Sequence, residues 1–161
     1  MGVHTHDITA VMPASVSLAN LSMISSSLRE RLVNRIVNDE EMPHDLAERI
    51  LDQAIGYLRL ASIEPEGHYS PSPLVDIGWH TFILYTREYS QFCSDITNGG
   101  FIHHEPTDEE GVPNLSSGPI GTMQAMQKNG IVVDEPLWAH MHSGDCVNCN
   151  SCRSSKCKCG L

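Results

Sequence analysis

The feature that most constrains the fold is the helical spacing of apolar residues near the start of the chain. Between about Ser15 and Asp39 they recur every three or four residues, which places them on one face of an α-helix. They are Leu18, Leu21, Ile24, Leu28, Leu32 and Ile36. The sequence therefore predicts a first amphipathic helix over residues 15–39, which must bury this face against other elements.

Further helices are predicted along the chain. The second begins at Pro43 and runs to about Ser62, and the Pro-, Gly- and Ser-rich residues 64–73 then form a surface connection. The third begins at Pro73, runs to about Ile96 and is apolar around much of its circumference, which favours a central position in the bundle. Gly99 and Gly100 are expected to end it through a left-handed cap.

Two shorter helices are expected in the last third of the chain. One passes through Met123 and Met126 and ends at Gly130, and the other is capped by Asp134 with Trp138 as its anchor. We therefore expect an all-α fold, a small bundle of four to five helices. Residues 1–14 are expected to be a flexible N-terminus, 15–142 a single helical domain and 143–161 an irregular cysteine-rich tail.

Composition and charge exclude several classes of function. The chain has 161 residues, is 40% hydrophobic and carries a net charge of −10, which disfavours nucleic acid as a partner. It has no apolar run of the roughly 20 residues needed to span a membrane, and no signal-peptide pattern at its N-terminus. We therefore expect a cytoplasmic protein that does not act at a membrane. The cytoplasm is reducing, so clustered cysteines there are expected to bind metal rather than to form disulfides.

The tail carries the densest set of potential metal ligands. They are His142, Cys146, Cys149, Cys152, Cys157 and Cys159. Spacings of one and two residues let neighbouring thiolates converge on one ion, so the tail is expected to bind zinc. The ligands outnumber the four that one zinc ion needs, which leaves copper(I), iron or an iron–sulfur centre as alternatives.

Two other interpretations of the tail are open. In the first, the tail is a disordered end whose thiols have no role in the native protein, or form adventitious disulfides during purification. Alternatively, the helical domain is an interaction or leader domain, and a protein partner modifies or cleaves the tail, in which Ser151, Ser154 and Ser155 accompany the cysteines.

A second candidate site lies in the helical domain. Asp76 and His80 are four residues apart and share one face of a helix, and His103 and His104 follow the glycine cap. A carboxylate with two imidazoles can hold iron(II) or zinc with coordination positions left open for catalysis. The alternative is structural: Asp76 favours the helix N-terminus, and His80 is a hydrogen-bonded histidine beside Trp79.

A sequence pattern extends from Val75 to His104. It contains an Asp, two residues and then Trp-His, a later Tyr, a Gly and a final His, which here are Asp76, Trp79, His80, Thr81, Tyr89, Gly100 and His104. This pattern resembles the N-terminal region of the glycine-rich domain-containing protein family, over about residues 18–106. Many members carry a second His two residues after the first, where this chain has Phe82. The resemblance implies a helical architecture and a site, but no reaction.

Three functions follow from these patterns. The first is a metal-binding protein whose tail holds the ion, and the second is an enzyme with a mononuclear metal held by Asp76, His80 and His104. The third is an interaction or leader domain. Tyr85 and Tyr89 are expected to pack in a seam between helices rather than to donate protons, and Cys93 is expected to be an unreactive thiol in the core.

Overall fold

The computed structural model describes residues 17–105 and 117–139 and confirms the all-α prediction. Over these residues the chain forms helices and no strand. The elements are the 3-10 helix η1 (Ala19–Met23) and the α-helices α1 (Ser26–Glu40), α2 (His44–Ile63), α3 (Pro73–Leu84), α4 (Thr86–Thr97), α5 (Gly118–Lys128) and α6 (Glu135–Ala139). The predicted flexible N-terminus and cysteine-rich tail, including His142, lie outside the described residues.

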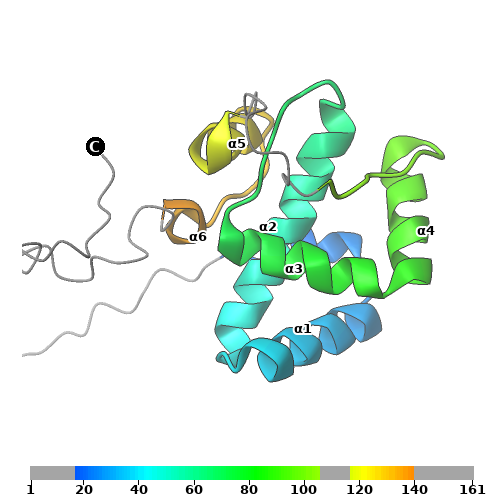
Figure 1. Cartoon of the computed structure of the whole chain (residues 1–161), viewed down its shortest axis with the longest axis vertical. Helices are drawn as coiled ribbons and strands as arrows, with labels where there is room; N and C mark the ends of the chain where they lie inside the picture. The colour runs from blue at the N-terminus through cyan, green and yellow to red at the C-terminus, as the bar shows by residue number, and fades with distance from the viewer. Residues whose placement is uncertain (1–16, 106–116, 140–161) are drawn as a thin grey trace, which may run out of the picture.

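Helix α2 is the centre of the bundle. Eleven of its 20 residues are buried, and Ile50, Leu51, Ile55 and Leu58 have no exposed surface. In Figure 1 α3 crosses in front of α2, α1 lies across the lower end of α2, and α5 and α6 lie to one side. The sequence placed the third predicted helix at the centre, and this was wrong. Five of the 12 residues of α3 and three of the 12 residues of α4 are buried, against eleven of 20 in α2.

The first predicted helix is interrupted. The chain forms η1, becomes extended at Ser25 (φ −66°, ψ 151°) and then begins α1, where the Ser25 side chain accepts a hydrogen bond from the Leu28 amide. The interruption lets Asn20 and the Leu21 amide turn toward the carboxylate of Asp52 on α2. The hydrogen bonds to the buried Asp52 therefore favour a break in the chain, although the apolar spacing alone predicted one continuous helix.

The third predicted helix is also broken, at Tyr85 (φ −90°, ψ 64°) between α3 and α4. A straight helix would separate Phe82 and Phe92 by about 15 Å along its axis. Instead their ring centroids lie 5.3 Å apart, and Tyr89, Phe92 and Cys93 are buried. The expectations that Tyr89 packs in a seam between helices and that Cys93 belongs to the core are confirmed. Asn98 (φ 55°) takes the left-handed position ahead of the predicted glycines.

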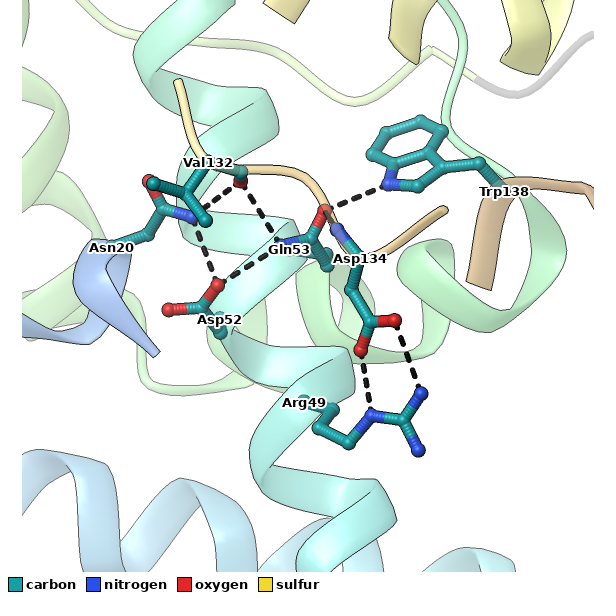
Figure 2. A network of polar contacts seen from close by, with 7 residues as sticks. All are labelled: Asn20, Arg49, Asp52, Gln53, Val132, Asp134 and Trp138. Atoms are coloured by element: carbon teal, nitrogen blue, oxygen red, sulfur yellow. Dashed lines mark hydrogen bonds and ion pairs between the residues drawn. The ribbon is translucent and has the colours of Figure 1, made fainter. Parts of the chain in front are cut away.

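A buried polar network joins η1, α2, residues 131–134 and α6 (Figure 2). The Gln53 carboxamide oxygen accepts from the Trp138 indole N–H at 2.8 Å and from the Asp134 amide at 3.0 Å. Its nitrogen donates to Asp52 at 2.9 Å and to the Val132 carbonyl at 3.2 Å. Burial raises the pKa of Asp52, although hydrogen bonds from Asn20, Leu21 and Gln53 favour its charged form.

Asp134 has a different role from the one predicted. Its carboxylate was expected to cap the last helix, but its two oxygens accept from Nε and Nη2 of Arg49, at 2.6 and 3.0 Å (Figure 2). Its backbone carbonyl accepts from Leu137 and begins α6 instead. The ion pair thus fastens the residues before α6 to α2.

Gly78 sets the distance between α3 and α2. A methyl group at this position would lie 2.9 Å from the Cβ of Ala54 and 3.0 Å from the carbonyl oxygen of Ile50. The second contact is with helix backbone, which cannot move away easily. The close packing of α3 on α2 therefore requires glycine at this position.

No helix among residues 17–105 and 117–139 combines the length and the apolar character needed to cross a membrane.

Replacing Gly78 by alanine is expected to destabilise the fold by about 1–3 kcal/mol, because the added methyl group overpacks the contact between α3 and α2. Urea unfolding followed by circular dichroism measures this change. An unchanged or higher unfolding free energy would contradict the packing described.

Replacing Gln53 by leucine leaves the Trp138 indole and the Asp134 amide without their acceptor. Because each buried donor without a partner costs about 1–3 kcal/mol, we expect a loss of at least about 2 kcal/mol in unfolding free energy. The control is Gln124→Leu, an exposed glutamine on α5, which should change stability by no more than about 0.5 kcal/mol. Equal effects of the two substitutions would show that the network does not stabilise the fold.

Candidate metal centre

Asp76 and His80 are placed by the first two turns of α3. The Ser72 hydroxyl caps this helix by accepting from the Val75 amide at 3.2 Å, and it donates to the Leu137 carbonyl of α6 at 2.7 Å. The Asp76 amide bonds to the Ser72 carbonyl at 2.8 Å. Asp76 thus lies in the first turn, and His80 follows one turn later on the same face.

His104 reaches this face from the segment that follows α4. The Tyr89 hydroxyl donates to the Ile102 carbonyl at 2.7 Å and accepts from the Trp79 indole N–H at 2.9 Å. The His104 ring packs against Trp79, with 4.3 Å between ring centroids. A hydrogen bond from Tyr89 on α4 and a ring contact with Trp79 on α3 therefore hold the segment in place.

Asp76 lies between the two imidazoles. Its Oδ2 is 3.2 Å from Nε2 of His80, and its Oδ1 is 3.0 Å from Nε2 of His104. One ligand atom from each residue lies within 4.8 Å of the other two. The two imidazoles meet edge to face at 4.3 Å. The three potential ligands therefore converge on one point.

The surroundings of the three side chains differ. The exposed fraction of the side chain is 59% for His80, 34% for Asp76 and 19% for His104. Tyr57 lies behind, with its ring 5.0 Å from that of Trp79. Burial, together with the negative charge of Asp76, raises the pKa of Tyr57 to about 12. The Trp79 ring therefore covers one side of the cluster, and the cluster is exposed to solvent at His80.

Three of the four predicted residues of this site come together. His103 does not join them: it is exposed, and its ring packs against Phe101 at 4.9 Å. Neighbouring residues in an irregular segment point in different directions, and the sequence could not show which imidazole turns inward. The tail ligands Cys146, Cys149, Cys152, Cys157 and Cys159, together with His142, lie outside the described residues.

Sequence reasoning missed the role of Tyr89 beside this site. It assigned Tyr89 to a helix seam, and the ring does pack edge to face on Phe82 at 5.3 Å. Nothing in the sequence linked its hydroxyl to Ile102, because this contact depends on the direction that the chain takes after α4.

The fold and the cluster define a helical domain with an aspartate and two histidines on one face. A family model described as UCP032817-like matches residues 21–117, more than half of the chain, and the chain belongs to this family. The matched region contains Asp76, His80, Tyr89 and His104, and the family description names no ligand or reaction. No curated protein and no solved structure matches the chain.

This match corrects the resemblance to the glycine-rich domain-containing protein family, which was wrong. The pattern behind it rested on a few positions, two of which, Trp79 and Tyr89, are buried and hydrogen-bonded to each other. Aromatic residues at helical spacing serve this packing role in many folds, so they did not identify a family.

Proposed function

We propose that this protein binds one divalent transition-metal ion in its helical domain, through Asp76, His80 and His104. The observation that carries the proposal is the convergence of three ligand atoms within 4.8 Å of one another. Ligands that bind one ion at about 2.1 Å lie roughly 3–3.5 Å apart when they are adjacent. The two contacts of Asp76, at 3.0 and 3.2 Å, already meet this spacing. The exposed His80 side chain has room to rotate toward the ion.

Zinc is the first expectation for this site, and iron(II) is the alternative. Two imidazoles and one carboxylate suit these ions, whereas calcium and magnesium prefer oxygen ligands throughout. Three protein ligands leave at least one coordination position for water or a substrate. The exposed His80 side chain leaves one side of the cluster accessible to such a molecule, which favours a metalloenzyme.

The cysteine-rich tail is proposed as a second metal-binding segment, on the strength of its ligand spacing. Its soft thiolates suit zinc, copper(I) or an iron–sulfur centre in a reducing, cytoplasmic compartment. Modification of the tail by a protein partner is the competing proposal. The net charge of −10 disfavours nucleic acid as a further partner.

The first experiment measures metal in the full-length chain, purified without a His tag and under anaerobic conditions. A tail-substituted chain, in which the five tail cysteines become serine and His142 becomes alanine, should retain about one equivalent of zinc or iron. Adding Asp76→Ala or His104→Ala should remove this ion, because each substitution deletes one of three ligands. Elemental analysis gives the stoichiometry.

The control is His103→Ala, which deletes an imidazole next to His104 but outside the cluster. It should leave the metal content unchanged. Metal that disappears with the tail substitutions alone would place binding in the tail and refute the site in the helical domain. Absence of metal from every chain, including after incubation with zinc, would refute both metal proposals and favour a domain that presents its tail to a partner.

Trp79 offers an independent readout, because its ring contacts His104. Adding Co²⁺ to the metal-free, tail-substituted chain should quench tryptophan emission, since a paramagnetic ion bound to His104 lies next to the indole. The quenching should be lost in His104→Ala and in Trp79→Phe, which retains Trp138, and preserved in His103→Ala. Equal quenching in all four chains would show that cobalt binds elsewhere.

A further inference from the structure

We propose that Tyr89 is a positioning residue for the metal centre: its hydroxyl holds the segment before His104 so that the imidazole faces Asp76. This inference rests on the metal-binding function proposed above. Tyr89 is not a metal ligand, but in this role it increases the affinity of the site for its ion.

The hydrogen bonds of Tyr89 fix the direction of its hydroxyl. The Trp79 indole N–H has no acceptor capacity, so at 2.9 Å it must donate to the Tyr89 oxygen. The Tyr89 proton is then directed to the Ile102 carbonyl at 2.7 Å. Ile102 precedes His104 by two residues, so this bond anchors the backbone next to the ligand.

The position of Tyr89 is itself constrained. The residue is 2% exposed, and its ring meets Phe82 and Phe101 edge to face at 5.3 and 5.4 Å. Burial raises the pKa of its hydroxyl, which therefore keeps its proton and remains a donor. A rigid, protonated group thus supports an otherwise irregular segment.

Tyr89 supports His104 by a second route through Trp79. Its oxygen orients the indole, and the indole ring packs against the His104 ring with 4.3 Å between ring centroids. Asp76 and His80 lie on α3 and are placed by helix geometry. The loss of the Tyr89 hydroxyl should therefore weaken the contribution of His104 and leave the other two ligands in position.

The test is Tyr89→Phe in the full-length, tail-substituted chain, which keeps the ring and removes the hydroxyl. Loss of a contact that orients a metal ligand reduces affinity by about 10–100-fold. We expect a decrease of at least about tenfold in zinc affinity, measured by competition with a chelator. The visible spectrum of the Co²⁺ form should also change, because one imidazole is no longer held in place.

The matched control is Tyr57→Phe. Tyr57 is also buried, packs on Trp79, and donates to a backbone carbonyl, that of Tyr69, at 3.3 Å. This carbonyl is not in the segment that carries His104. Tyr57→Phe should therefore change the unfolding midpoint without changing zinc affinity by more than about twofold.

A double-mutant cycle separates positioning from general stability. The His104→Ala chain loses its co-purified ion, but the weak zinc binding that Asp76 and His80 retain is measured by direct titration. In this background Tyr89→Phe should cause no further loss of that residual affinity, although its effect on the unfolding midpoint should persist. If Tyr89→Phe does not fold, Trp79→Phe removes the donor to Tyr89 and puts a smaller ring beside His104, and a loss of at least about tenfold is again expected.

The outcomes distinguish the two proposals. A parent chain that binds zinc, with Tyr89→Phe binding it equally well, would overturn the role of Tyr89 and leave the metal centre intact. The same holds if the loss persists in full in the His104→Ala background. A parent chain that binds no zinc would overturn the metal-binding proposal itself.

Discussion

The arrangement of the helices depends on the buried carboxamide of Gln53. Its oxygen accepts from α6 and from the residue before it, and its nitrogen donates to Asp52 and to Val132. A buried amide without partners costs more than its hydrogen bonds contribute when they are made, so the segments must meet in this one way.

This network also determines where the candidate metal centre begins. Gln53 holds Trp138, and the adjacent Leu137 accepts from the Ser72 hydroxyl that caps α3. The first turn of α3 carries Asp76, the residue between the two imidazoles. The Gln53 network on α2 is thus connected through α6 to the N-terminus of α3, which carries Asp76 and His80. Gly78 in turn lets α3 lie close to α2.

Much of the fold followed from apolar spacing, but the interruptions of the helices did not. Val75, Trp79, Phe82, Tyr89 and Cys93 would share one face of a straight helix, so the sequence predicted no break at Tyr85. The break is favoured by contacts between rings that only a turn brings together. Likewise, the polar contacts of Asn20 with Asp52 and Val132 separate η1 from α1. The spacing of apolar residues along the chain does not indicate either break, because both depend on tertiary contacts.

The sequence by itself determined the helical class and the pairing of Asp76 with His80, because residues four apart on a helix must lie together. Only the tertiary structure decided that His104 joins them and that His103 does not. The reason is physical: an irregular segment has no fixed period, and its side chains take their directions from distant partners. Here those partners are Tyr89, which binds the Ile102 carbonyl, and Trp79, which packs against the His104 ring.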